Sequence, residues 1–95
     1  MSVYIEGQAV RVTVTCKVGA VNTDPTTLVF RVRNAVGAIS THIYGTDVEV
    51  VRDSLGVFHM DVLLDAGGSW DVRCETTGAA AGASETSFDV NFSRF

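Results

Sequence analysis

The chain has 95 residues, of which 46% are hydrophobic, 19% are charged and one is proline, and its formal net charge is −4. This composition argues against intrinsic disorder and predicts one domain with a thin core, because a chain of this length buries only about two thirds of the surface that it exposes when unfolded. The seven Lys and Arg residues are scattered along the chain and form no basic stripe, which argues against nucleic acid as a partner.

Strands of alternating apolar and polar residues dominate the chain. The clearest strand begins at Ala9 and ends at Val18, and the later ones are bounded by Gly, Asp or Asn. In chain order, the predicted strands cover residues 3–5, 9–18, 26–33, 39–44, 48–52, 57–64, 70–76 and 86–95. No apolar run approaches the roughly 20 residues that cross a bilayer, so a membrane is not expected as a partner. The N-terminus carries no secretory signal, which predicts synthesis in the cytosol.

The alternation assigns one face of each later strand to the core. The predicted core positions are Leu28, Phe30, Val32, Phe58, Met60, Val62, Leu64, Trp70, Val72, Cys74, Phe88, Val90 and Phe92. Residues 77–84 carry no large apolar side chain and predict a mobile loop, and Phe95 is expected to pack on the core. Short strands at this spacing predict an all-β, antiparallel sandwich, because two sheets that are each wet on one side can bury each other's apolar faces.

Two cysteines, Cys16 and Cys74, fall on inward positions of the second and the penultimate strand. This is the placement of the cysteine pair that joins the two sheets of an immunoglobulin-like sandwich of about seven strands, so residues 1–95 are predicted to form one such domain. The pair is either a disulfide or two buried thiols, and a cytosolic protein favours the thiols. Zinc is not expected, since neither cysteine has a ligand partner nearby in sequence.

No motif of catalytic or metal-binding type interrupts the strands. His42 and His59 lie on different strands and are expected at the surface, and the serines lack a G-x-S-x-G context. Five aspartates lie in or beside turns, and turn formation explains them without calcium: Asp24, Asp47, Asp53, Asp65 and Asp71. The chain is therefore expected to need no cofactor and not to be an enzyme.

Four segments, residues 24–27, 44–47, 51–59 and 65–70, together resemble small immunoglobulin-like domains encoded in the structural gene regions of tailed bacteriophages and prophages. Their sequences are Asp-Pro-Thr-Thr, Tyr-Gly-Thr-Asp, Val-Arg-Asp-Ser-Leu-Gly-Val-Phe-His and Asp-Ala-Gly-Gly-Ser-Trp, and the likeness covers about residues 7 to 92. The resemblance implies a non-enzymatic virion protein, first of all a capsid decoration protein bound to the major capsid protein. A head-to-tail connector or tail accessory subunit is the alternative place in the virion.

A decoration protein docks through one patch or one strand edge, and a homo-oligomer would also cover exposed surface. The candidate docking surface consists of the outward-facing residues Val29, Val51, Val57 and Leu63. A carbohydrate- or cell-surface-binding module is an alternative from another class of protein. Exposed and adjacent side chains of Tyr4 and Tyr44 would favour that alternative.

Overall fold

The computed structural model describes residues 2–93, and within this range the chain forms strands and turns but no helix. Accordingly, no helical segment of the described chain is long and apolar enough to cross a membrane. An all-β fold is therefore confirmed.

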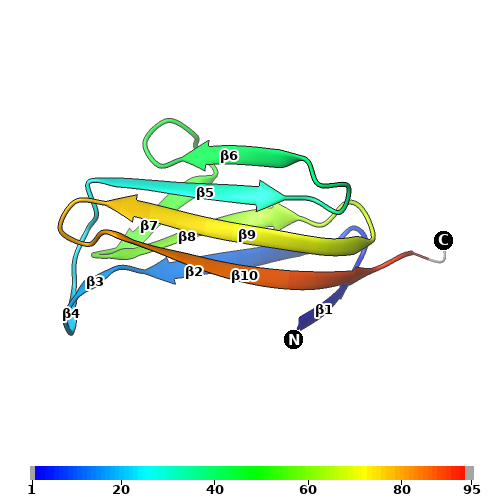
Figure 1. Ribbon diagram of the computed structural model, residues 1–95, viewed down its shortest axis with the longest axis horizontal. Coiled ribbons are helices and arrows are strands. Elements are labelled where there is room, and N and C mark those ends of the chain that lie inside the picture. The colour runs from blue at the N-terminus through cyan, green and yellow to red at the C-terminus, as the bar shows by residue number, and fades with distance from the viewer. Residues whose placement is uncertain (1, 94–95) are drawn as a thin grey trace.

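Two sheets face each other as two layers (Figure 1). The larger sheet contains, in spatial order, β1 (Ser2–Ile5), β10 (Gly82–Asn91), β9 (Gly68–Thr77), β5 (Thr27–Arg33) and β6 (Ile39–Ile43). The smaller sheet contains β2 (Ala9–Thr15), β8 (Val57–Leu63) and β7 (Val50–Ser54), and a ribbon pairs β3 (Lys17–Val18) with β4 (Val21–Asn22). The strands of both sheets pair antiparallel, except that β1 runs parallel to β10.

The core lies between the two sheets and takes side chains from both. Twelve of the thirteen predicted core positions are buried, namely Leu28, Phe30, Val32, Phe58, Met60, Val62, Leu64, Trp70, Val72, Cys74, Phe88 and Val90. Period-two alternation predicted these positions because successive side chains of a strand point to opposite faces of its sheet. Trp70 also donates its indole N–H to the carbonyl of Ala66, at 2.9 Å, which satisfies its polar atom inside the core.

Phe92 is the predicted core residue that the structure places elsewhere, since 72% of its surface is exposed. The pairing of β10 with β9 ends at Val90, so the chain leaves the sheet before Phe92. Its ring lies against Gly67 instead. The predicted packing of Phe95 concerns a residue outside the described range.

Some strand boundaries also differ from the prediction, and the described chain contains ten strands rather than about seven. The predicted strand over 9–18 is interrupted at Cys16, whose N–H donates to Gly56 and whose carbonyl accepts from Thr23. Val48 lies in a turn and is 93% exposed, so β7 begins two residues later than predicted.

The predicted mobile loop over residues 77–84 is wrong. Strand β9 continues to Thr77 and β10 begins at Gly82, so a short turn joins two ten-residue strands. Within this turn Ala80 is buried, and its carbonyl accepts a hydrogen bond from the Thr76 hydroxyl at 2.7 Å. The small side chains of this segment show no alternation of apolar and polar residues, so the sequence did not predict the hairpin. Backbone hydrogen bonds hold the two strands together, and these bonds do not depend on the side chains.

Candidate docking site

The polar residues of the four resembling segments hold turns together. Asp24 accepts the N–H of Gly56 at 2.7 Å and pairs with Arg52, whose Nη2 lies 3.0 Å from the carboxylate. These two interactions lower the pKa of Asp24, the Gly56 N–H contributing more than Arg52. They join the loop that precedes β5 to the turn between β7 and β8, which makes Asp24 a fold determinant.

Polar groups in two of the other segments also hold turns by hydrogen bonds within the protein. A carboxylate oxygen of Asp47 accepts the N–H of Ile43 at 2.7 Å and closes the turn after β6. Glu6, close to β1, accepts the N–H of Gly67 at 2.9 Å within the segment that leads into β9. Because these polar groups are bound internally, strand edges and exposed faces are the surfaces that remain for docking.

The four predicted docking residues do not form one surface. Val51, Val57 and Leu63 project from the outer face of the smaller sheet, whereas Val29 projects from the outer face of the larger one, on the opposite side of the molecule. Val29 and Val57 are half-buried, and Leu63 is exposed. The prediction of a single apolar patch is therefore wrong, because sequence alternation separates inside from outside but cannot say which sheet holds a strand.

Charged residues cover the outer face of the larger sheet. Arg31 pairs with Glu75 on the neighbouring strand, and Arg73 pairs with both Glu75 and Glu85. The hydrogen bond from Arg31 is the main reason why the pKa of Glu75 lies below its ordinary value. A face of paired opposite charges keeps this side hydrated, so it is a weak candidate for apolar docking.

His59 is buried with 7% of its surface exposed, which corrects the prediction of a surface histidine. It lies on the outer face of β8, the central strand of the smaller sheet, with Thr13 and Val51 opposite it on the flanking strands. Its Nδ1 lies 2.7 Å from a carboxylate oxygen of Asp53. Side chains of the two flanking strands cover His59 because β8 is the central strand of its sheet. The position of a strand within the sheet therefore decides how far its outward side chains are buried.

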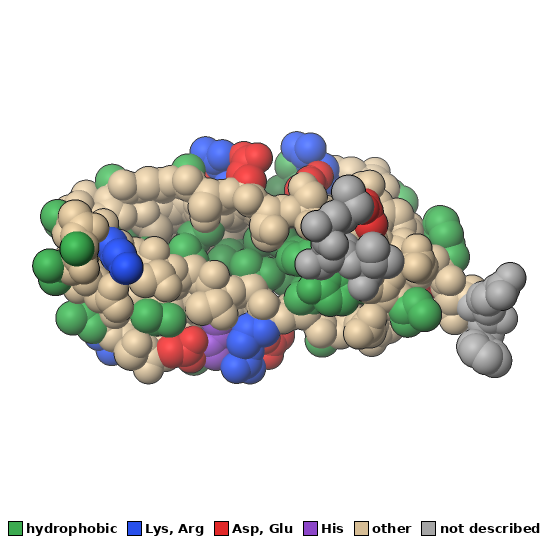
Figure 2. All heavy atoms as spheres, turned by 90° about the horizontal axis from the view of Figure 1, so that it is seen from below, with side chains coloured by type: hydrophobic (Ala, Val, Ile, Leu, Met, Phe, Trp, Pro, Cys, Tyr) green, Lys and Arg blue, Asp and Glu red, His purple; other side chains and the backbone are tan. Residues whose placement is uncertain are grey.

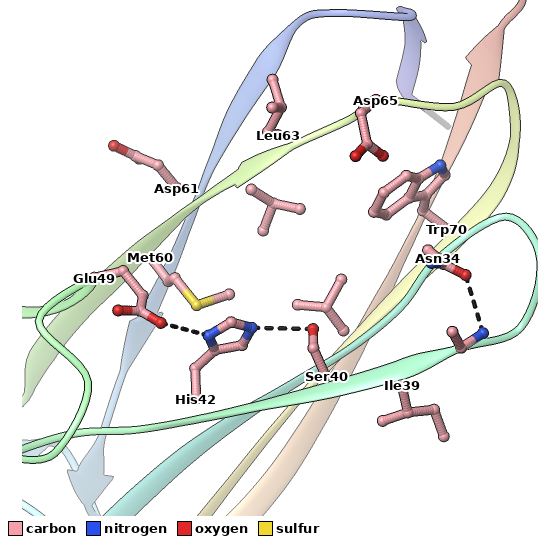
Figure 3. A pocket seen from close by; sticks show the side chains of 13 residues that line it. Asn34, Ile39, Ser40, His42, Glu49, Met60, Asp61, Leu63, Asp65 and Trp70 are labelled. Carbon is pink, nitrogen blue, oxygen red and sulfur yellow. Dashed lines mark hydrogen bonds and ion pairs between the residues drawn. The ribbon is translucent and has the colours of Figure 1, made fainter.

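Ser40, His42 and Glu49 form a hydrogen-bonded chain in a pocket of about 310 Å³ (Figure 3). Ser40 and His42 lie two residues apart on β6, so their side chains share the face that points towards the smaller sheet. His42 Nε2 lies 3.0 Å from the serine hydroxyl, and Nδ1 lies 2.7 Å from Glu49. This is the hydrogen-bond order of a Ser-His-acid triad, and it was invisible in sequence because a turn brings Glu49 to the histidine.

Acyl transfer needs more than this order of hydrogen bonds. It also needs backbone or side-chain hydrogen-bond donors that lie about 3 Å from the position of the oxyanion that forms in the transition state. The N–H groups along the free edge of β6 lie in the plane of the sheet, whereas the Ser40 side chain stands perpendicular to it. The cluster joins β6 to the connection that leads to β7, and we call it the Ser40 clamp. The hydrogen bond from His42 lowers the pKa of Glu49 accordingly.

The seam between β2 and β10 is an open edge of the sandwich. Each of these strands has one free edge there, because β2 ends the smaller sheet and the described part of β1 pairs with β10 only from Phe88 to Asn91. Figure 2 shows this side, where hydrophobic side chains form the floor of a hollow between the two layers. Three adjoining hollows, of about 210, 100 and 250 Å³, follow the seam.

Side chains at the seam are less covered than their neighbours in the same sheets. Val10, Val12 and Val14 point inward from β2 but are only half-buried, whereas Phe58 and Met60, opposite two of them on β8, are each 2% exposed. On β10, the inward positions Ser84 and Thr86 are exposed. The side chains between the two sheets are thus closely packed along the central strands and less covered at this edge.

Cys16 and Cys74 are free thiols, and both are buried. They line the same end of the seam, Cys16 directly after β2 and Cys74 on β9. Burial raises the pKa of the Cys74 thiol to about 12, and the proximity of Cys16 adds to this effect. Such thiols are poor nucleophiles and poor metal ligands, because both functions need the thiolate.

Tyr4 and Tyr44 are far apart. Tyr4 lies on β1 and packs edge-on against Phe88, while Tyr44 follows β6 and packs edge-on against Phe58. Strands β1 and β6 are opposite edges of the larger sheet, so the two rings cannot form one stacking platform. The condition that would have favoured a carbohydrate-binding module is not met.

Comparison of the chain with protein-family models, curated proteins and solved structures finds no match in any of the three.

Proposed function

We propose that this protein is a non-enzymatic structural component of a bacteriophage virion, specifically a capsid decoration protein that binds the major capsid protein after synthesis in the host cytoplasm. The observation that carries the proposal is the structural role of the four segments that resemble phage immunoglobulin-like domains. Asp24, Asp47 and the N–H of Gly67 in these segments hold turns of a small sandwich, the last by bonding to Glu6. The described strands of this sandwich also have unpaired edges, which are its sites of contact. A decoration protein needs this combination, because it must fold alone and dock by one edge or patch.

We further infer that the sandwich is of the immunoglobulin-like type. The strand orders β1-β10-β9-β5-β6 and β2-β8-β7 agree with that topology, as do the buried positions of Cys74 on the larger sheet and of Cys16 directly after β2 of the smaller one. One departure is that Trp70 lies on β9, the strand of Cys74, whereas antibody domains carry their core tryptophan on the strand that corresponds to β5.

The copy number of the protein in purified particles tests its place in the virion. Mass spectrometry of particles produced by the phage or prophage that encodes this chain would measure it against the major capsid protein. A copy number comparable to that of the capsid protein supports decoration, and a much smaller one assigns the protein to the connector or the tail. Absence from washed particles would overturn the virion proposal.

A fluorophosphonate probe tests the non-enzymatic part of the proposal. An activated serine reacts with this probe, so the Ser40 clamp predicts no labelling of the native protein above the level of the Ser40→Ala variant. Ser69→Ala is a matched control, since Ser69 is also an exposed strand residue. Labelling that is lost only in Ser40→Ala would make the protein a serine hydrolase.

A further inference from the structure

We propose that the seam between β2 and β10 is an acceptor groove, in which an extended segment of a partner protein adds to the free edge of β10. The floor of the acceptor groove is formed by Val10, Val12, Val14, Phe30 and Val72. This proposal rests on the proposed virion role and supplies the way in which the protein docks.

Backbone hydrogen bonds identify the free groups of β10. The carbonyl of Asn91 accepts the N–H of Glu6, so Asn91 faces the side on which β1 lies. Backbone groups of alternate residues point to the same side of a strand, and therefore Ala83 and Glu85 face that side as well. Among the described residues, none pairs with them there, because the pairing of β1 with β10 starts at Phe88.

Strand β1 already shows the mode of binding. It adds to the edge of β10 in parallel, over residues 88–91, and its Tyr4 packs on Phe88 at one end of the acceptor groove. A further segment in line with β1 would continue the same pairing along residues 82–87 of β10. Six residues of strand span roughly 20 Å, which sets the length of the segment that the edge can bind.

The floor of the acceptor groove explains why such a segment would bind stably. Val10, Val12 and Val14 remain half-buried although they pack against the core. Alternate side chains of an added strand would point into the adjoining hollows and cover these valines. Removing apolar surface from water is favourable, so a few small apolar side chains supply affinity beyond the backbone hydrogen bonds.

The charge at one end of the acceptor groove specifies the occupant further. Lys17 lines the hollow that also contains Ala83 and Ser84. Of the cations in residues 2–93, only Lys17 and Arg33 lack an ion pair, whereas Arg11, which lines another of the hollows, is paired with Asp61. The partner segment should therefore carry small apolar residues at alternate positions and, because it runs parallel to β10, a carboxylate near its N-terminal end.

The described edge strands of a second copy belong to sheets that carry a second layer behind them. An extended segment of a different protein has no such layer. We therefore assign the acceptor groove to a partner strand.

Binding of a synthetic peptide tests this assignment. The probe is a fluorescent peptide of sequence Asp-Thr-Val-Thr-Val-Thr-Val, measured by anisotropy against the full chain. We expect saturable binding that weakens at least about tenfold in Ala83→Pro, which removes an edge N–H, and remains unchanged in Ala83→Val, which keeps it. The side chain of residue 83 lies on the outer face of the sheet, as that of Glu85 does, so neither change fills the groove.

Val12→Thr provides a second variant if Ala83→Pro does not fold. It makes the floor polar at nearly constant volume, and it too should weaken peptide binding. The assignment is overturned if no saturable binding occurs up to about 1 mM peptide, or if both variants bind like the unchanged chain. Self-association without peptide that Ala83→Pro abolishes would assign the groove to a second copy and equally overturn it.

The peptide result and the particle result can fail separately. A protein that is absent from particles but binds the peptide retains its acceptor groove and loses its virion role. A protein that is abundant in particles but does not bind the peptide retains the virion role and docks by another surface.

Discussion

Single residues in this protein act mainly by fixing turns, and Asp24 is the clearest case. Its carboxylate holds the N–H of Gly56 and the guanidinium of Arg52, so it connects two loops that are about thirty residues apart in sequence. Within the described residues, no group of three or more His, Cys, Asp or Glu is arranged to hold a metal ion.

The pKa of Asp24 gives its role a pH dependence. Because the folded-state pKa lies below the unfolded one, the stabilisation is present above the unfolded value and is lost as the pH falls through the folded value. Asp24→Asn should lower the urea midpoint at neutral pH, and the difference from the unchanged chain should shrink below about pH 4. Asp65→Asn, at an exposed position, is the control, and equal urea midpoints for the two variants at neutral pH would contradict the role of Asp24.

Gly56 is the second residue that the turn requires. Its φ is +74°, and a Cβ at this position would lie 2.6 Å from the carbonyl oxygen of Cys16. Gly56→Ala should therefore destabilise the fold by about 3 kcal/mol, combining a left-handed backbone with a clash against main-chain atoms. Gly37→Ala, at φ +88° with no atom within 4 Å of the added carbon, should cost only about 1 kcal/mol. Urea unfolding compares the two variants, and similar losses would mean that the clash is relieved by movement.

At the scale of elements, β10 is paired on both sides at one end and on one side at the other. Its residues 88–90 lie between β9 and β1, whereas residues 82–87 pair with β9 alone among the described strands. The amides of Ser84 and Thr86 point to β9, and those of Ala83 and Glu85 point to the acceptor groove.

Hydrogen exchange should reproduce this alternation. We expect slow exchange at Ser84 and Thr86 and fast exchange at Ala83 and Glu85, measured by NMR on the free protein. Binding of the peptide should slow exchange at Ala83 and Glu85 and leave the other two unchanged. Uniform exchange along the strand in the free protein would show that its edge is already covered.

The whole molecule is two sheets joined by a thin core, to which the cysteines contribute from both sides. Cys74 lies on the larger sheet, while Cys16 follows the last residue of β2 in the smaller one. Ionising a buried thiol places a charge in this interface, which is why burial raises the pKa of Cys74 from 9.0 to about 12.

This shift predicts a loss of stability in alkali. A folded-state pKa above the unfolded value stabilises the fold fully below the unfolded value, and the contribution is lost as the pH rises towards the folded one. The urea midpoint should therefore fall between about pH 9 and about pH 11 more steeply in the unchanged chain than in Cys74→Ala. Parallel curves would show that the thiol is not buried in solution. Titration of tyrosine and lysine affects both proteins alike and cancels in the comparison.

Alternation in the sequence was sufficient to identify the all-β class and twelve of the thirteen predicted core residues, because inside and outside alternate along any strand that covers a core. It could not identify what depends on neighbours in space. The burial of His59, the separation of Val29 from Val51, and the hairpin over residues 77–84 all depend on which strands lie side by side.

The same distinction applies to the candidate sites. Local patterns were sufficient to point Cys16 and Cys74 inward and to predict the turns that contain Asp24 and Asp47. Only the tertiary structure brought Glu49 to His42 and left β2 and β10 with free edges across an apolar seam. Strand order and edge pairing arise from contacts between residues distant in sequence, and a local pattern of side chains contains no information about which partner each strand will find.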